Sequence, residues 1–453
     1  MTARLARLCF PSRSRLFLGV CGSVGAIYLA SGQRRLHADA STTSESKSSR
    51  LPSFNVRTRP DDVVLRSEVL AANSNDPPED YVIAMPIEPF AWRFYGVFDG
   101  HGGPQCAKYL YDKLLLRLND TLWAHYLKDN VIWLEDIHRL VKETFLSIDK
   151  EMVDAPAERL RAEAKKDGPP RPIRTMAANE LQESRSGSSA VVAFYQGNLK
   201  QLHVAVVGDC RAVLGRKRPT EPAPQTLILD ADSGEAPPKY DVHVLSIDQT
   251  PDNLDEVARL RAAHPNEPQL FRGGSFLGWG ITRAFGTGVM KWGVEMQNWM
   301  HENVLGRKPH ALCQSPPYFT AEPEITVTDV QSGDFMIMAS DGFWECLTNE
   351  EAVGLVGLWL NLRGGNPLTE TATGERVVDR QDLPVDIKGG RTHYERWGVK
   401  KRFITAGESV GEVLVRNALG GADKDLYDAL IDTPAPHSRL LRDDISLAVV
   451  FFA

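Results

Sequence analysis

The chain has 453 residues, of which 42% are hydrophobic and 25% are charged, with a formal net charge of −7 at pH 7. This length allows one large domain or two ordinary ones, and the composition is that of a globular protein. Nucleic-acid-binding surfaces concentrate Lys and Arg to neutralise phosphates, so the acidic balance argues against a nucleic-acid partner.

The N-terminal segment, residues 1–38, differs in composition from the rest of the chain. It is rich in Arg and Ser and has no acidic residue before Asp39, which is typical of a mitochondrial transit peptide. An apolar run at 16–30 is shorter than the ~20 residues of a comfortable membrane-spanning helix. A secretory signal is the alternative interpretation. We expect import into mitochondria, either into the matrix or with a single N-terminal anchor in the inner membrane.

The cysteines agree with an intracellular destination. They lie far apart in the sequence and none has CxxC spacing, so they indicate neither a disulfide framework nor a structural zinc site. We expect reduced thiols at all six positions, which are Cys9, Cys21, Cys106, Cys210, Cys313 and Cys346.

Residues 39–62 are rich in Ser, Thr and Lys and predict a solvated linker, so the folded domain is expected to occupy 63–453. Short apolar, β-branched runs bounded by Gly and Asp predict buried strands. These runs lie at 94–100, 188–196, 200–209, 334–342 and 443–452. Helical spacing of apolar residues appears at 106–118, 136–152, 253–264, 350–362 and 407–419.

The order of these elements favours antiparallel sheets. Two predicted strands, 188–196 and 200–209, follow one another with only a Gly197-Asn198 turn between them, which indicates a hairpin and not a βαβ unit. The sequence therefore predicts an α+β sandwich with helices outside the sheets. Three segments look like insertions that form surface flaps and loops, at 154–184, 217–240 and 364–402.

Acidic residues stand at the ends of three predicted strands. Asp99-Gly100 and Asp341-Gly342 each follow an apolar run, and Asp443-Asp444 opens the last one. One such Asp-Gly step is often only a turn. Clustered carboxylates, however, repel one another and are costly to desolvate, so several of them converging indicates bound cations. Oxygen ligands alone favour Mg²⁺ or Mn²⁺ over zinc.

Seven short motifs occur together in one order along residues 63–452. They are Glu79-Asp80, 95–103 (YGVFDGHGG), 186–190 (SGSSA), 207–212 (VGDCRA), 282–286 (TRAFG), 339–345 (ASDGFWE) and 442–445 (RDDI). In these motifs the chain resembles the type-2C metal-dependent serine/threonine protein phosphatases. The resemblance implies a four-layer αββα sandwich with two mainly antiparallel sheets at its centre, and hydrolysis of phosphoserine and phosphothreonine on proteins.

The resemblance also implies a role for each matching acid. Asp99 would bridge two Mg²⁺ or Mn²⁺ ions, with the Gly100 carbonyl on one and Asp341 and Asp443 on the other. Two cations ~3.5–4 Å apart lower the pKa of a shared water and neutralise the phosphoryl oxygens in the transition state. The remaining acids implied by the resemblance are Glu79 and Asp80, which would act through water, and Asp209 and Glu345, which with Asp341 resemble a looser third-metal site.

Some of these residues also have a purely structural interpretation. The alternative for Asp209 is a turn acid at a strand end, and the alternative for Glu345 is a helix-start acid. His101 is the candidate general acid for the departing seryl or threonyl oxygen. Its alternative is a structural histidine that is hydrogen-bonded to a carboxylate.

The chain departs from the family pattern at three places. Many members carry an arginine that holds the phosphate shortly before the Glu-Asp pair, whereas this chain has Asn75. Arg66 and Arg93 are candidate substitutes, and the phosphate-binding arginine is left unassigned. Thr287 stands where the family commonly has Asp, and Asp248-Gln249 where it commonly has Asp-His.

Three further stretches, 72–80, 260–265 and 318–324, resemble the mitochondrial pyruvate dehydrogenase phosphatase branch. That branch implies a mitochondrial phosphoprotein substrate such as the pyruvate dehydrogenase complex. The alternatives are a weakly active or inactive metal-binding regulator and a small-molecule phosphatase. Cys210 and Arg216 have the C-x5-R spacing of cysteine-dependent phosphatases, but the residues between them alternate as in a strand, so we reject that chemistry.

Overall fold

The computed structural model describes residues 63–87, 91–169, 171–219, 238–369, 375–387, 389–405 and 407–453. The predicted targeting segment 1–38, its apolar run 16–30 and the linker 39–62 lie outside these residues, as does most of the 217–240 insertion. Within the described ranges, no helix combines the length and the apolar character needed to cross a membrane.

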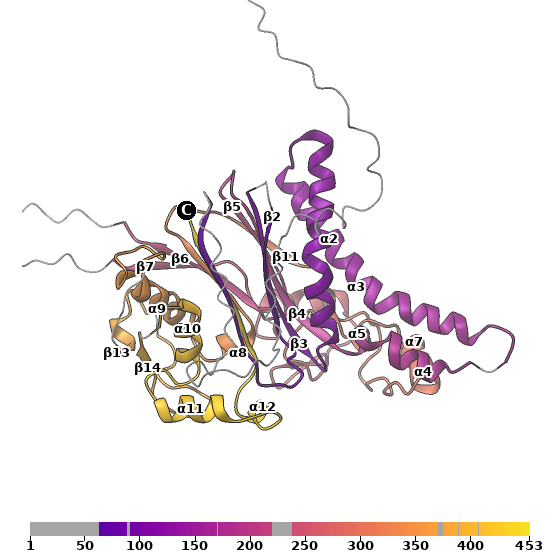
Figure 1. Cartoon of the computed structure of the whole chain (residues 1–453). Coiled ribbons are helices and arrows are strands. Elements are labelled where there is room, and N and C mark those ends of the chain that lie inside the picture. The colour runs from indigo at the N-terminus through magenta and orange to yellow at the C-terminus, as the bar shows by residue number, and fades with distance from the viewer. Residues whose placement is uncertain are drawn as a thin grey trace, which may run out of the picture. The chain divides into compact units, whose positions relative to one another are not determined.

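Two antiparallel sheets form the centre of the folded domain (Figure 1). The first has the order β1 (Val64–Ala72), β15 (Ile445–Phe452), β12 (Phe335–Ala339), β6 (Arg211–Lys217) and β7 (Tyr240–Val244). The second has the order β11 (Glu324–Asp329), β5 (Gln201–Val207), β4 (Gly187–Gln196), β3 (Trp92–His101) and β2 (Tyr81–Ile87), with β10 (Phe285–Gly286) paired to β4. Two short hairpins lie apart from them, β8 (Phe271–Arg272) with β9 (Ser275–Phe276) and β13 (Val377–Asp379) with β14 (Arg402–Ile404).

Helices cover the outer face of each sheet. Helix α2 (Gln105–Asp129) packs on β2, β3 and β4, and α3 (Leu134–Ala164) packs on α2. On the other side, α9 (Asn349–Asn361) and α10 (Val410–Ala418) pack on the first sheet. The layers therefore run helix, sheet, sheet, helix, which confirms the predicted αββα sandwich.

The two sheets bury an apolar core between them. Its side chains come from alternate positions of the strands, as the two-residue period of a strand requires. They include Tyr95, Val97, Val191, Val204, Leu214, Met336, Met338 and Val450. A second core joins the first sheet to α9 and α10.

Shorter helices connect these layers. They are α4 (Ile173–Glu180), α5 (Gln182–Arg185), α6 (Leu254–Ala263), η1 (Gly288–Met290), α7 (Val294–Asn303), α8 (Asp341–Trp344), η2 (Arg380–Asp382), α11 (Lys424–Asp432) and α12 (Ser438–Leu441).

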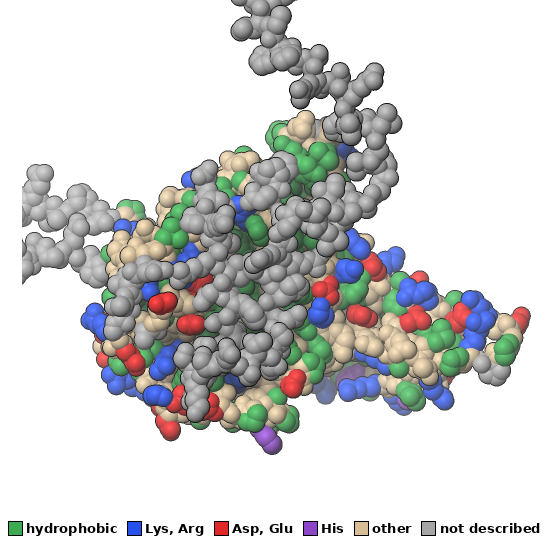
Figure 2. All heavy atoms as spheres, viewed as in Figure 1, with side chains coloured by type: hydrophobic (Ala, Val, Ile, Leu, Met, Phe, Trp, Pro, Cys, Tyr) green, Lys and Arg blue, Asp and Glu red, His purple; other side chains and the backbone are tan. Residues whose placement is uncertain are grey.

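The segment 154–184 is largely helical, although the sequence predicted flaps and loops there. It contains the last turns of α3, followed by α4 and α5. Its Ala, Glu, Lys and Arg residues are strong helix formers, and Pro156 is tolerated inside α3. Figure 2 shows acidic and basic side chains interspersed at the right of the view, where Figure 1 labels α3, α4 and α7. Among them, Arg161 of α3 pairs with Glu295 of α7.

The antiparallel order of the strands brings the ends of several strands to one edge of the sandwich. Strands β3, β5 and β12 end there, and β2 and β15 begin there, because neighbouring strands run in opposite directions. The acids that follow or precede these strands therefore meet although they are far apart in the sequence.

Candidate metal centre

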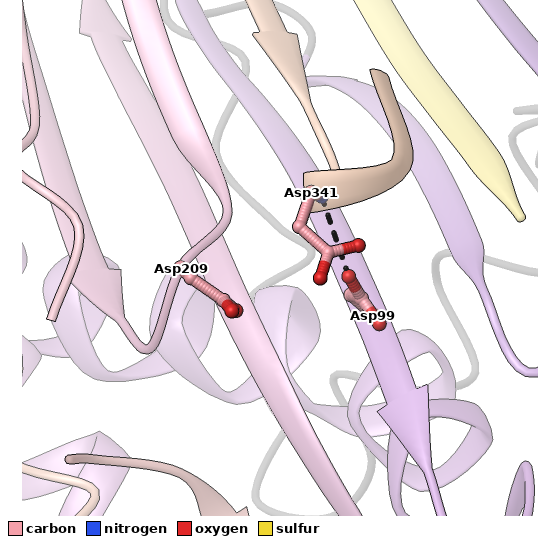
Figure 3. A group of neighbouring side chains, drawn as sticks. All are labelled: Asp99, Asp209 and Asp341. Atoms are coloured by element: carbon pink, nitrogen blue, oxygen red, sulfur yellow. Dashed lines mark hydrogen bonds between the residues drawn. The ribbon is translucent and has the colours of Figure 1, made fainter. Parts of the chain in front are cut away.

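Three aspartates from different strand ends lie together at this edge. Asp99 is in β3, Asp209 follows β5, and Asp341 opens α8 two residues after the end of β12. One carboxylate oxygen from each lies within 4.8 Å of the other two. Figure 3 shows the Asp99 and Asp341 carboxylates side by side, with that of Asp209 pointing toward them. The backbone N–H of Asp341 donates to Oδ2 of Asp99 at 3.4 Å, so the two strand ends are joined directly.

Asp80 and Asp443 belong to the same electrostatic cluster. Asp80 is only 5% exposed, and its Oδ2 has no hydrogen-bond partner among the described residues. Burial raises the pKa of Asp80 well above its ordinary value, and the negative charges of Asp444, Asp341 and Asp443 raise it further. Asp443 forms a salt bridge with Arg439 on its outer side.

The electrostatics of the cluster fit a cation site. Burial first, and then repulsion from neighbouring carboxylates, raises the pKa of Asp99 and of Asp341 well above the ordinary value of an aspartate. Divalent cations would relieve the repulsion among these acids and give the unpaired buried oxygen of Asp80 a partner. The donors are all oxygens, which suits Mg²⁺ or Mn²⁺.

Asp444 has a different task from its neighbour Asp443. Its carboxylate accepts hydrogen bonds from the backbone N–H groups of Ser74, Asn75 and Glu79, the last two at 3.0 Å. Burial alone would raise the pKa of Asp444, but these hydrogen bonds hold it below its usual value. Asp444 therefore fixes the loop that presents Glu79 and Asp80, a role that the sequence did not predict.

Glu79 lies beside the cluster and is held by backbone hydrogen bonds on both its side chain and its carbonyl. Its Oε1 accepts the backbone N–H of Gly103 at 2.6 Å, and its own carbonyl accepts that of Gly100 at 3.1 Å. A Cβ on Gly100 would lie 2.4 Å from that carbonyl oxygen, so only glycine allows the approach. Burial raises the pKa of Glu79, and the Gly103 hydrogen bond acts against the rise.

The sequence predicted Asp209 and Glu345 as ligands of one ion, but the two side chains differ in burial and position. Asp209 is within the cluster and accepts the Ser189 hydroxyl at 2.7 Å, and burial raises its pKa to about 6. Glu345 is at the rim: its side chain is 53% exposed and lies 3.7 Å from Arg396. Its charge nevertheless raises the pKa of Asp341 and of Asp209.

Gln249 supports the turn that carries Asp209. Its side-chain oxygen accepts the backbone N–H of Gly208 at 2.7 Å, and its own N–H donates to the Gly208 carbonyl at 2.8 Å. Gln249 is fully buried. Gln249 thus gives the Gly208-Asp209 turn a packed support.

His101 ends β3, two residues after Asp99. Its Nε2 is hydrogen-bonded to the hydroxyl of Thr287 at 3.0 Å, not to a carboxylate. Burial, and then the positive charge of Lys291, lowers the pKa of His101 to about 4. The imidazole is therefore neutral near pH 7 in this structure.

Thr287 is a further residue at the site whose role the sequence did not indicate. It has a left-handed backbone, with φ of 49°, which is rare for a β-branched residue. Its N–H donates to the Ser186 carbonyl at 2.8 Å, and the preceding Gly286 donates to buried Asp149 at 2.9 Å. The only signal in the sequence was that Thr287 replaces the family's usual Asp.

The cysteine-dependent alternative finds no support in the geometry. Arg211–Lys217 form strand β6, and Arg216 pairs with Asp334. Burial raises the pKa of the Cys210 thiol well above its ordinary value. The cysteines in the part of the chain that the structure describes are free thiols, at Cys106, Cys210, Cys313 and Cys346.

Comparisons with known proteins agree on one family. The family model described as Protein phosphatase 2C matches residues 88–379. A protein phosphatase 2C homolog of Schizosaccharomyces pombe is 32% identical over 402 residues, which cover 86% of this chain and 81% of that protein.

Two mitochondrial enzymes are also similar to the chain. The pyruvate dehydrogenase (acetyl-transferring) phosphatase 1 of Saccharomyces cerevisiae is 32% identical over 420 residues, covering 86% of this chain and 69% of that protein. The human pyruvate dehydrogenase (acetyl-transferring) phosphatase 2 is 26% identical over 437 residues, covering 86% and 78%.

Among solved structures, the chain is similar to a serine-threonine phosphatase 2C from Toxoplasma gondii, with a TM-score of 0.46 and 16% identity over 89% of this chain and 100% of that one. The family assignment rests on the sequence matches, which agree with the motifs and with the acids at the sheet edge. The chain belongs to the protein phosphatase 2C family of metal-dependent serine/threonine protein phosphatases.

Proposed function

We propose that this phosphatase hydrolyses phosphoserine and phosphothreonine of a mitochondrial protein by direct attack of water at a centre of two divalent cations. The observation that carries the proposal is the meeting of Asp99, Asp209 and Asp341 within 4.8 Å at one edge of the sandwich. No nucleophilic side chain is required, because the attacking group is water.

Asp99, Asp341 and Asp443 are the proposed direct ligands, together with the carbonyl of Gly100. Glu79 and Asp80 would complete the shell through water, and Asp209 with Glu345 would hold a third, looser ion. The cations, when bound, supply a water of lowered pKa and neutralise charge on the phosphoryl oxygens. The buried, unpaired Oδ2 of Asp80 and the raised pKa values of the acids support this assignment.

His101 is the proposed proton donor to the leaving oxygen. Its Nε2 is hydrogen-bonded to Thr287, and it stands two residues after Asp99 in β3. Burial lowers its pKa to about 4 in the free protein, so this role requires that a phosphoryl dianion bound beside it favours the protonated imidazole more strongly than the cations oppose it. The proton then passes to the seryl or threonyl oxygen, which is a poor leaving group as an alkoxide.

The pyruvate dehydrogenase complex is the proposed substrate, and mitochondria are the proposed location. Two of the similar proteins are named for that substrate and that compartment. The composition of residues 1–38 supports import independently. We further propose that 63–453 is the phosphatase domain, preceded by the targeting segment and the linker 39–62, with insertions near 154–184, 217–240 and 364–402.

The activity test uses the full chain with a phosphothreonine peptide. We expect hydrolysis with Mn²⁺ or Mg²⁺ that stops on chelation and returns when the metal is restored. Hydrolysis that continues at the same rate in excess chelator contradicts the metal mechanism. The substrate is tested by comparing kcat/KM on the phosphorylated pyruvate dehydrogenase complex with that on phosphorylated casein, where equal values contradict the proposed preference.

Protease protection of a tagged protein in isolated mitochondria tests the location. Protection after rupture of the outer membrane is expected for the matrix, whether the protein is free there or anchored to the inner membrane and facing inward. Carbonate extraction then separates these two forms. Digestion in intact mitochondria contradicts import.

A further inference from the structure

The structure bears on the missing phosphate-binding arginine. Both substitutes that the sequence suggested are held away from the metal centre. Arg66 is 6% exposed, pairs with Glu68 and donates to the Pro367 carbonyl at 2.9 Å. Arg93 is 5% exposed and lies six residues before Asp99 on the same extended strand, which is about 20 Å.

A different arginine, Arg439, stands at the edge of the centre. It lies in α12 and forms a salt bridge with Asp443. Its charge also acts on Glu79, Asp341 and Asp444, so it faces the metal-binding acids and not the far surface. Its side chain remains 43% exposed, which leaves it accessible to a substrate.

Helix α12 is fixed against the loop that carries Asn75. The buried hydroxyl of Ser438 donates to the Ser74 carbonyl, so the residue before Arg439 contacts the residue before Asn75. At the other end of α12, the Leu441 carbonyl accepts the indole N–H of Trp397 at 3.0 Å. Arg439 therefore lies on a helix that contacts the loop carrying Asn75, the position at which many family members have an arginine.

Asn75 itself is committed to holding the loop. Its side-chain amide donates to Oε2 of Glu79 and to Oδ2 of Asp444, both at 3.2 Å. It also carries no charge with which to attract a phosphoryl dianion. The positive charge at this side of the centre comes from Arg439.

The other arginine nearby in sequence is fully engaged. Arg442 is 5% exposed, and its three nitrogens donate to the carbonyls of Leu430, Ala72 and Asn73. The Arg439 guanidinium contacts Asp443 alone among the described residues, although a guanidinium has five N–H donors. Its remaining donors are free to bind two oxygens of one phosphoryl group, a geometry that arginine favours.

We propose that Arg439 binds the phosphoryl oxygens of the substrate, in place of the arginine that is absent at position 75. The proposal rests on the proposed function, because it concerns the substrate of the same centre. It assigns the charge for phosphate recognition to α12, close to the C-terminal end of the chain, and leaves Asn75 with a supporting role.

The test compares Arg439→Ala with the wild-type full chain. Inorganic phosphate is the probe, through its inhibition constant in p-nitrophenyl phosphate hydrolysis and through its effect on Tm in the presence of Mg²⁺. We expect the inhibition constant and KM to rise about 10- to 100-fold, since a charge-assisted hydrogen-bond pair is lost, and the phosphate-induced rise in Tm to disappear. The half-saturating Mn²⁺ concentration should not rise, because Asp443 keeps its charge.

Arg139→Ala is the matched control. Arg139 is 48% exposed and pairs with Glu143 four residues later on α3, as Arg439 pairs with Asp443, but it lies away from the centre. We expect wild-type constants for this variant. In the Arg439→Ala background, Asn75→Arg should recover at least tenfold of the lost phosphate affinity, since it restores the charge from the adjacent loop.

Three outcomes overturn the proposal. Phosphate binding that is unchanged in Arg439→Ala removes Arg439 from the phosphate site. A rise in the half-saturating Mn²⁺ concentration that matches the loss of activity makes Arg439 only a positioning residue for Asp443. A larger loss of phosphate binding in Arg396→Ala gives the role to the arginine beside Glu345. If the wild-type protein shows no metal-dependent turnover, the proposed function is contradicted instead. The effect of phosphate on the Tm of the wild type and of Arg439→Ala then still tests the role of Arg439.

Discussion

The side chain of Asp444 accepts a hydrogen bond from the backbone N–H of Glu79 at 3.0 Å, and so joins the start of the last strand to a loop 365 residues earlier. Its neighbour Asp443 instead faces the metal centre and Arg439. Gly342 also packs closely against Asp444, since a Cβ on Gly342 would lie 2.2 Å from the Asp444 carbonyl oxygen. Two adjacent aspartates thus divide structural support and proposed metal binding between them.

We expect Asp444→Asn to lower the free energy of unfolding by about 2–3 kcal/mol, because several buried backbone N–H groups lose a charged acceptor. Asp443→Asn should cost less than about 1 kcal/mol, since its partly exposed salt bridge contributes little. Urea unfolding of both variants without metal measures the difference. Equal destabilisation would contradict the division of roles.

Asp99→Asn should have opposite effects on activity and on metal-free stability. We expect kcat to fall by roughly 10³-fold or more, since the proposed bridge between the cations is lost. In chelator, however, the variant should be more stable than the wild type, because a buried negative charge that repels Asp80, Asp209 and Asp443 is removed.

Scanning calorimetry of Asp99→Asn with chelator and with Mn²⁺ provides the measurement. The rise in Tm on adding Mn²⁺ should be largely lost in the variant. Asp112→Asn on α2, which removes an exposed partner of Lys108, is the control and should respond as the wild type does. A variant that is less stable in chelator would argue against repulsion in the cluster.

His101→Gln tests the proposed proton donor. The kcat on a phosphothreonine peptide should fall about 10²- to 10⁴-fold, because the leaving alkoxide needs a proton. On p-nitrophenyl phosphate the loss should be small, since nitrophenolate leaves without one. Equal losses on both substrates would make His101 a structural residue held by Thr287.

Glu256 predicts a pH dependence of stability away from the metal centre. This side chain is 1% exposed and accepts hydrogen bonds from Arg283, Arg259 and Thr282. Burial alone would raise the pKa of Glu256, but these partners lower it to about 2. The motif residues Thr282 and Arg283 thus bind the Glu256 side chain of α6.

The folded pKa of Glu256 lies below its unfolded value of 4.5. The ionised Glu256 carboxylate and its hydrogen-bond partners therefore stabilise the protein above pH 4.5, and this contribution is lost as the pH falls toward 2. Glu256→Gln should cost about 3–5 kcal/mol at pH 7, because Arg283 loses its buried carboxylate partner and keeps only the half-exposed Glu324. The difference from the wild type should shrink in unfolding measurements between pH 4.5 and pH 2. A difference that stays constant over this range would mean that the charge of Glu256 is not what matters.

The layers of the fold could be predicted because their strands are buried and carry continuous apolar runs, as in β4 and β15. Asp99 and Asp341 stood out for the same reason, as acids directly after such runs. The helical character of 154–164 was missed, although its composition favours a helix, because Ala-, Glu- and Lys-rich sequence also suits a surface loop.

Other features depend on contacts between distant residues and have no local signal. Asp444 and Asp443 look alike in sequence, and only the position of the 74–79 loop distinguishes them. Arg439 could not be selected for the same reason, since its approach to the centre depends on the contact of Ser438 with Ser74. Thr287 was noted only as a departure from the family, and its contact with His101 required the fold.

The central claim is that the acids at the sheet edge bind the cations that the reaction uses. Anomalous diffraction at the manganese edge from crystals grown with Mn²⁺ tests it most directly. We expect two strong peaks roughly 3.5–4 Å apart, with Asp99 between them and Asp341 and Asp443 on one of them. Active crystals whose Mn²⁺ ions lie away from Asp99 and Asp341 would contradict it.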